Sequence, residues 1–256
     1  MLKGFFFIAA VALIAVISHR RGRLEEKVFK RVPVSDWLTI FLFPLLFYIG
    51  WYSIVRNILL RPSMTLFPLG DFDLIAIMLI FFAGAYVGDG IHFTGKIMWR
   101  YLRQDKRALS YRVNEMFHGR LSHYLIFLNS LFVCFMLGIL EINHPLEDRI
   151  SDLYLISLIL ASVILGISST KSIFFTSQWF GGYNKPLFFL VVGLTFLLIG
   201  FTNIYDVNLR YYPVTIFTTS TFFTIIATYS LRFFLVFFSL SEKKRLQFLV
   251  RFLHIT

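Results

Sequence analysis

Charged residues are scarce in this sequence. They make up 15% of its 256 residues, whereas soluble domains carry about 25%. Hydrophobic residues make up 57%, against about 45–50% in soluble domains, and the mean hydropathy is +0.73. This shortage of charge argues against a soluble globular domain and indicates an all-α polytopic membrane protein. Since each spanning helix uses about 20 residues, we expect a single integral membrane domain over residues 1–256.

Cysteine is almost absent, because Cys134 is the only one. A single cysteine excludes a disulfide framework within the chain and a metal cage built from cysteines. Cys134 lies in an apolar run, where a small buried hydrophobic side chain is its ordinary role. Internal repeats and low-complexity tracts are absent as well. This absence and an odd number of apolar segments argue against a transporter built from two simple halves and leave open repeats plus one extra helix.

Long apolar segments are abundant, and seven of them predict spanning helices. Their ranges are 4–18, 37–55, 72–91, 121–140, 153–169, 187–202 and 214–240. Pro44 lies inside the second segment, and we expect it to kink that helix. Gly84 and Gly88 form a small-x-x-x-small pair in the third, which permits close approach of another helix.

Positive charge is distributed unevenly between the two sides of this seven-helix arrangement. Nineteen of the 25 Lys and Arg residues lie on one side, in 19–36, 95–122, 170–186 and 241–256. The positive-inside rule therefore predicts an outside N-terminus and a cytosolic C-terminus, in a plasma membrane or bacterial inner membrane. The net charge of +11 then points to anionic lipid head groups as partners, and no nucleic-acid-binding motif is present.

The polar connection 19–36 is predicted to be a solvated cytosolic connector. The stretch from Asp89 to His123 is more informative, since it holds three of the six histidines. Within it, basic residues recur at helical spacing: Lys96, Arg100, Arg103 and Arg107. This pattern predicts a basic amphipathic interfacial segment at about 95–120. It serves either to set topology or to bind an anionic lipid or phosphate-bearing ligand.

Two acidic-x-x-His pairs flank this segment, Asp89 with His92 and Glu115 with His118. Carboxylate-bridged di-metal bundles use the same spacing, but spacing alone assigns no metal here. His118 and His123 are five residues apart, about 140° on a regular helix, so they would not point together unless the helix begins after His118, with Ser122 as its N-cap. Histidine titrates near neutral pH, so these residues either hydrogen-bond at a wet boundary or act in acid–base chemistry.

The last apolar segment carries a polar stripe of Thr221, Thr224, Thr228 and Arg232. Arg232 lies about 27 Å along this helix, at the depth predicted for Asp89 in the third helix. A charge at that depth needs a partner or water. We therefore predict that Arg232 and Asp89 face the bundle interior as a close pair. The alternative is that Arg232 extends to the head groups.

Signatures of several membrane-protein families are missing. The last segment has no lysine for a retinal Schiff base, since Lys243 and Lys244 follow its end. The multi-histidine boxes of desaturases and the Gly-x-Ser-Gly motif of rhomboid-like proteases are absent. Asp89-Gly90 and Glu25-Glu26 stand without the residues that head-group phosphotransferases and prenyl-protein proteases need. The sequence therefore indicates no family.

Together these features predict a cytosol-facing polar vestibule that binds an anionic lipid head group or small anion, with histidines handling protons. The alternative is a structural or assembly subunit of a membrane complex. The catalytic candidates are Asp89, His92, Glu115, His118 and His123. The ligand-binding candidates are Lys96, Arg100, Arg103, Arg107, Thr221, Thr224, Thr228 and Arg232. Enzyme, carrier and scaffold all remain open, as do the cofactor and the oligomeric state.

Overall fold

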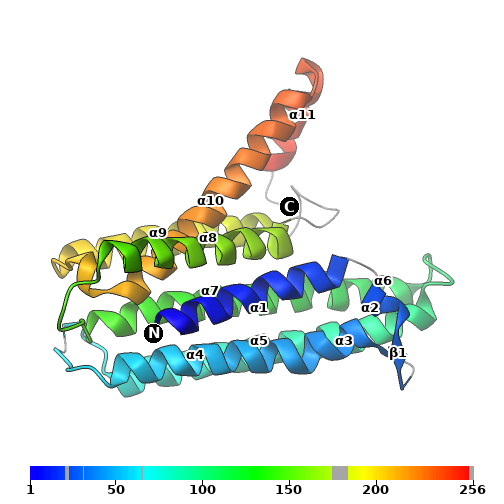
Figure 1. Cartoon of the computed structure of the whole chain (residues 1–256). Coiled ribbons are helices and arrows are strands. Elements are labelled where there is room, and N and C mark those ends of the chain that lie inside the picture. Colours follow the sequence, from blue (N-terminus) through cyan, green and yellow to red (C-terminus); the bar gives the residue numbers. More distant parts are fainter. Residues whose placement is uncertain (21–22, 31, 65, 175–183, 254–256) are drawn as a thin grey trace.

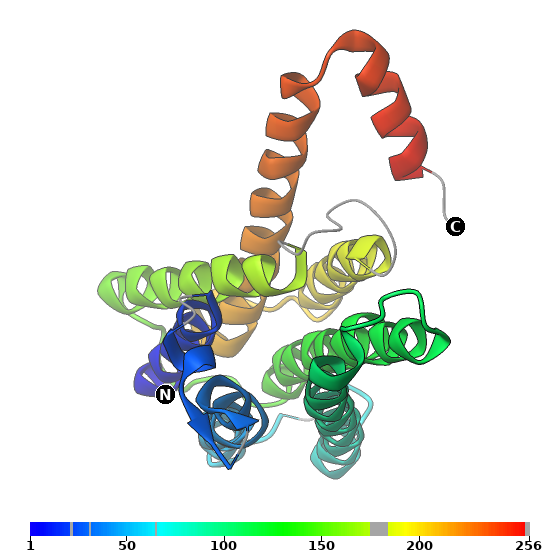
Figure 2. The same cartoon turned by 90° about the vertical axis from the view of Figure 1, so that its right-hand side faces the viewer.

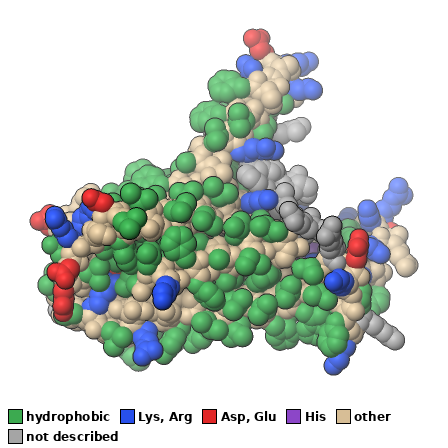
Figure 3. Space-filling model, in the orientation of Figure 1, with side chains coloured by type: hydrophobic (Ala, Val, Ile, Leu, Met, Phe, Trp, Pro, Cys, Tyr) green, Lys and Arg blue, Asp and Glu red, His purple; other side chains and the backbone are tan. Residues whose placement is uncertain are grey.

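The computed structural model describes residues 1–20, 23–30, 32–64, 66–174 and 184–253. Within these residues, six helices are long and apolar enough to cross a membrane, which confirms the prediction of an all-α membrane bundle. The first predicted helix forms an apolar helix over Leu2–Ser18 that is shorter than these six. Figure 3 shows hydrophobic side chains over most of the visible flank, with charged side chains gathered mainly toward the two ends and at the tip of the projecting arm.

The elements follow one another as a series of long helices joined by short connections. In chain order they are α1 (Leu2–Arg20), α2 (Arg23–Glu26), β1 (Val28–Phe29), β2 (Val32–Pro33), α3 (Val34–Trp37), the π-helical turn η1 (Leu38–Leu42), α4 (Phe43–Leu59), α5 (Asp71–Leu102), α6 (Leu109–Glu115), the π-helical segment η2 (Met116–Leu121), α7 (Ser122–Ile142), α8 (Asp152–Phe174), α9 (Asn184–Ile204), the 3-10 turn η3 (Leu209–Tyr211), α10 (Pro213–Ser239) and α11 (Glu242–Leu253).

The long helices α1, α4, α5, α7 and α9 run along one another, whereas α8 lies across them at an angle (Figures 1 and 2). The pairs α5–α7, α8–α10 and α1–α8 pack most extensively. Helix α10 crosses the bundle, and its second half leaves it (Figures 1 and 2). Its buried residues accordingly end at Tyr229.

Glycines allow α5 and α7 to approach closely. A Cβ on Gly84 would lie 2.6 Å from Asn129 Oδ1, and one on Gly88 would lie 2.9 Å from the backbone nitrogen of Ile126. The predicted role of Gly84 and Gly88 in close helix packing is therefore confirmed. Gly95 permits the same close approach to η2, since a Cβ added to Gly95 would lie 2.6 Å from His118 Cβ.

Helix α5 ends at Leu102 and not near residue 91. The predicted helical face from Lys96 to Arg107 is therefore wrong, because the chain turns after Leu102 before α6 begins. Packing against α7 outweighs the weak intrinsic helix propensity of the α5 glycines. Lys96 and Arg100 consequently belong to the end of a spanning helix.

The N-terminal connection also differs from its predicted form. The part of residues 19–36 that the structure describes includes a two-stranded hairpin and the start of α3. Asp36 there is only 2% exposed, so this part is not a fully solvated connector. The π-helical turn η1 follows and ends just before Pro44, which occupies the first turn of α4. Proline lacks a backbone N–H and crowds the preceding turn, so the wider turn accommodates it.

One end of the bundle is held by a polar network that we call the paired end: Arg61, Asp71, Glu141, His144 and Thr215. Arg61 Nη1 lies 2.9 Å from Glu141 Oε1, and the Glu141 side chain is 0% exposed. The backbone N–H of Thr215 donates to Glu141 Oε2 at 2.7 Å. His144 Nε2 lies 2.9 Å from Asp71 Oδ2. These contacts join the ends of α4, α5, α7 and α10.

Candidate functional site

A cavity of about 660 Å³ lies inside the bundle, between α1, α4 with η1, α5, α7, α8 and α10. Most of its wall is apolar or aromatic, including Trp51, Phe82, Phe127 and Phe222. Pockets for small-molecule ligands have volumes of about 300–1,000 Å³ and are lined mostly by such side chains. The cavity is therefore large enough to hold a ligand with a long apolar part.

Polar side chains concentrate in the part of the cavity wall that is remote from the paired end. At a rise of 1.5 Å per residue, Asp89 lies about 27 Å along the axis of α5 from its first residue, and Lys171 lies about 28 Å along the axis of α8. Both starts lie at the paired end, where Asp71 contacts His144 and Asp152 contacts Arg210. We call the opposite end the histidine end, because His92, His118 and His123 lie there.

The three histidine rings form one cluster. The ring centroid of His92 lies 4.7 Å from that of His118 and 4.7 Å from that of His123, and the latter two are 6.3 Å apart. His92 and His123 line the cavity. The expectation that His118 and His123 would point apart is wrong because the π-helical segment Met116–Leu121 separates them. A π-helix repeats at i to i+5, which brings residues five apart toward one face.

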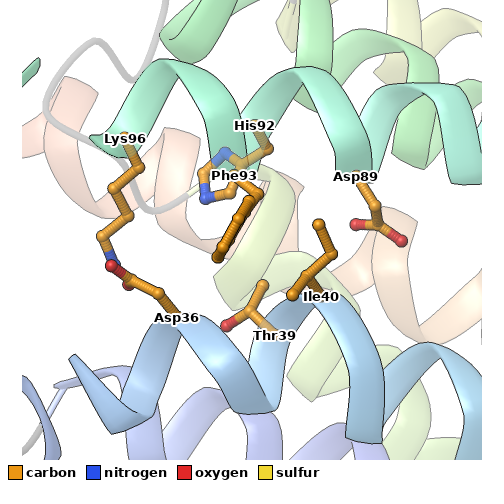
Figure 4. Close-up of a pocket in the computed structure, with 7 residues that line it drawn as sticks. All are labelled: Asp36, Thr39, Ile40, Asp89, His92, Phe93 and Lys96. Atoms are coloured by element: carbon orange, nitrogen blue, oxygen red, sulfur yellow. The ribbon is translucent and has the colours of Figure 1, made fainter. Parts of the chain in front are cut away.

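Asp89 lines both the cavity and a narrow crevice between α5 and the α3–η1 segment (Figure 4). Figure 4 shows its carboxyl group on the same side of α5 as His92 and Lys96. The predicted pair with Arg232 is absent, and the Arg232 side chain is exposed. Helix α10 leaves the bundle after Tyr229 (Figure 1), so equal depth along two helices does not bring these residues together.

Two of the predicted ligand-binding cations are engaged within the protein. Lys96 Nζ lies 2.5 Å from Asp36 Oδ1, and Arg100 pairs with Asp36 Oδ2. Figure 4 shows Lys96 extending from α5 to meet Asp36. Arg103 instead lies over the Trp99 ring, with 5.3 Å between its guanidinium carbon and the ring centroid. The structure thus brings Lys96 to the crevice beside the cavity, and Arg100 to the Asp36 carboxylate that also lines it.

The remaining sequence candidates are dispersed. Arg107 is exposed in the turn after α5. Glu115 Oε1 lies 4.0 Å from His118 Nδ1, and the Glu115 side chain is 43% exposed.

Within the predicted threonine stripe, Thr221 lines the cavity, although its hydroxyl donates to Phe217 O. Thr224 packs against Gly166, whose added Cβ would lie 2.6 Å from Thr224 Cβ. Thr228 is half-buried outside the cavity wall.

Sequence reasoning missed the polar face that α8 turns to the cavity, formed by Ser168, Lys171 and Ser172. Helix α8 extends to Phe174, whereas the apolar run predicts an end at residue 169 and leaves Lys171 in a loop. The spacing of three and four residues is the signal that could have found this face. Asp36 was missed because it lies in a polar connection.

Chemically, this arrangement provides hydrogen-bond donors, one ammonium group, one carboxylate and titratable imidazoles beside an apolar chamber. Among the residues that the structure describes, no group of three or more His, Cys, Asp or Glu side chains is placed to hold a metal ion. Comparison with protein-family models, curated proteins and solved structures finds no match. The site must therefore be interpreted from its own geometry.

Proposed function

We propose that the cavity binds a lipid-like amphiphile, with its chain in the apolar part and an anionic head group at the histidine end. The observation that carries this proposal is a single cavity of about 660 Å³ with an aromatic wall and a polar end. A wholly polar ligand would leave the aromatic wall unused. A wholly apolar ligand would leave Lys171 and Asp89 without a partner.

The polar face of α8 supports an anionic head group. Ser168 is 2% exposed, and its hydroxyl has no hydrogen-bond partner among the described residues. Lys171 forms no ion pair with any described residue. Together with Ser172, these side chains can donate to the oxygens of a phosphate or carboxylate, and hydrogen bonds with a charged partner are the stronger kind.

The location of positive charge supports a cytosolic orientation for the histidine end. The basic residues of 95–122 lie near this end, and such residues favour the cytosolic side of a membrane. Anionic head groups of the cytosolic leaflet would then be the nearest source of ligand. In this orientation the N-terminus is outside and the C-terminus is cytosolic.

The histidine cluster supports proton handling at the head group. His92 and His123 reach the cavity, while His118 contacts the partly exposed Glu115. Imidazole exchanges protons near neutral pH, so this series connects the head-group position with water. Such a series suits acid–base chemistry on the ligand or proton-linked binding.

The test is to fill the cavity and measure what the purified protein retains. Phe at position 12 (Ala12→Phe) enters the cavity from α1, whereas the matched control Ala10→Phe adds the same ring on the exposed side of that helix. Native mass spectrometry from mild detergent should show a bound amphiphile in the wild type and in Ala10→Phe, and its loss in Ala12→Phe. Equal retention by both variants would exclude the cavity as the binding site.

The projecting end of α10 favours a second function, that of an assembly subunit. Beyond Tyr229 this helix exposes Leu231, Phe234, Leu235 and Phe238, and it stands away from the helices of the bundle, with α11 beside it (Figure 2). In this role the protein extracted from its native membrane would have a mass above that of one chain. Replacing Phe234 and Phe238 with alanine would lower that mass, whereas Ala12→Phe would not.

A further inference from the structure

The cavity presents a carboxylate as well as an ammonium group. Asp89 lines it from α5, and Lys171 lines it from α8. These two residues do not pair with each other, and Asp89 forms no hydrogen bond or ion pair within the described part of the chain. A charge within the spanning region needs a counter-charge or water. One anionic head group would serve Lys171 but would leave Asp89 beside a second negative charge.

The nearby cations of α5 are not available to Asp89. Lys96 and Arg100 follow it on the same helix, but both contact the carboxylate of Asp36. Asp36 is 2% exposed, so this neutralisation is built into the folded protein. Besides Lys171, the other titratable groups in the cavity wall are Tyr86, His92, His123 and Cys134.

We propose that Asp89 binds a cationic amine carried beside the anionic group of the ligand, so that the cavity prefers head groups with an amine over anionic head groups that have none. This inference rests on the proposed function and deepens it by assigning the second charge of the head group. The anionic part lies at Ser168, Lys171 and Ser172 on α8, and the amine lies at Asp89 on the facing wall.

A primary or secondary amine fits this site for two reasons. Its N–H groups can donate both to the Asp89 carboxylate and to a neutral imidazole nitrogen of His92 or His123, and carboxylates and neutral imidazoles both accept hydrogen bonds. Tyr86 lines the same cavity as Asp89, and Phe93 lines the crevice that Asp89 also reaches; aromatic faces attract a cation within about 6 Å.

The cavity volume limits the rest of the ligand. About 660 Å³ lies in the middle of the range for sites that enclose small ligands. One acyl chain with a compact head group suits it, so single-chain lipids are the appropriate probes. Lysophosphatidylethanolamine and lysophosphatidylglycerol with the same oleoyl chain differ in whether the head group carries an amine.

The experiment measures retention of these two lipids by the full-length protein, with native mass spectrometry of detergent-solubilised samples. We expect the wild type to prefer the ethanolamine lipid by about tenfold, because a hydrogen bond with a charged group contributes about that factor. Asp89→Asn should abolish the preference, and Asp89→Glu should restore part of it. Lys171→Met should weaken both lipids equally.

The outcomes separate this inference from the proposed function. If Ala12→Phe removes neither lipid, cavity binding itself fails. If Ala12→Phe removes both lipids but the wild type does not distinguish them, only the amine assignment fails. An unchanged preference in Asp89→Asn would likewise overturn that assignment, since an uncharged amide cannot supply the counter-charge. Thermal unfolding of each variant in the same detergent verifies that the compared proteins are folded.

Discussion

The two ends of the bundle use buried polar residues in opposite ways. At the paired end, Arg61 and Glu141 meet each other, and Thr215 fills the remaining acceptor positions of the carboxylate. At the histidine end, Asp89 and Lys171 line one cavity without pairing. Groups whose partners are all within the fold stabilise it, whereas groups that face a cavity remain available to a ligand. The comparison therefore predicts opposite consequences of removing a carboxylate at each end.

The largest effect is expected at the paired end. Glu141→Ala leaves the Arg61 guanidinium buried without its carboxylate, and breaking a buried pair in this way costs about 3–5 kcal/mol. Chemical denaturation in detergent should report this loss in the free energy of unfolding. Glu147→Ala is the matched control, because Glu147 lies just beyond α7 but is exposed. A loss below about 1 kcal/mol, the value for an exposed ion pair, would contradict a structural role for Glu141.

Asp36 belongs to the histidine end but resembles the paired end in its contacts. Asp36→Asn removes the charge that Lys96 and Arg100 share, and it should lower the unfolding free energy by about 1.5–3 kcal/mol, the value of hydrogen bonds with charged groups. Glu26→Gln, an exposed change in the same connection, serves as the control. If Asp36→Asn altered lipid retention without altering stability, Lys96 and Arg100 would belong to the ligand site.

The close packing of α5 against α7 and η2 supports the histidine cluster, and Gly95→Ala tests this packing. The added Cβ would lie 3.1 Å from His118 Cα and closer still to its Cβ, so η2 must move away. Overpacking of this kind costs about 1–3 kcal/mol. Gly90→Ala is the control, because a Cβ there meets nothing within 4 Å, and alanine should raise helix stability by up to about 1 kcal/mol. Equal shifts of the unfolding temperature in both variants would show that α5 is not tightly packed at Gly95.

The spanning helices could be predicted from sequence because hydrophobic length is a local property. The six long helices coincide with six of the predicted apolar segments, although their ends differ. Those ends depend on distant residues. Helix α5 continues to Leu102 because Lys96 and Arg100 meet Asp36 and because α7 packs on its glycines. No pattern within residues 71–102 points to Asp36, and the Gly84 and Gly88 pair indicates a close helix without identifying it as α7.

The candidate site was predictable only in part, for reasons of geometry. The stretch from Asp89 to His123 does contribute three residues to the cavity wall, Asp89, His92 and His123, but their chemical roles stay predictions. The rotation per residue of a regular α-helix predicted that His118 and His123 point apart. The π-helical segment instead places both rings in one cluster. The depth argument for Arg232 assumed parallel helices, whereas α10 crosses the bundle and leaves it (Figure 1).

The smallest effect on stability, and the sharpest contrast with Glu141, is expected for Asp89→Asn. The amide has nearly the shape of the carboxylate, and no described partner is left unsatisfied by the change. We therefore expect the unfolding free energy to change by less than about 0.5 kcal/mol, as for substitutions away from specific contacts, or to rise because an unpaired charge leaves the spanning region. Denaturation without added lipid, run beside Glu141→Ala, gives the direct comparison. A loss of about 3 kcal/mol, as for a broken buried pair, would show that Asp89 is held by the fold, and the distinction between the two ends would fail.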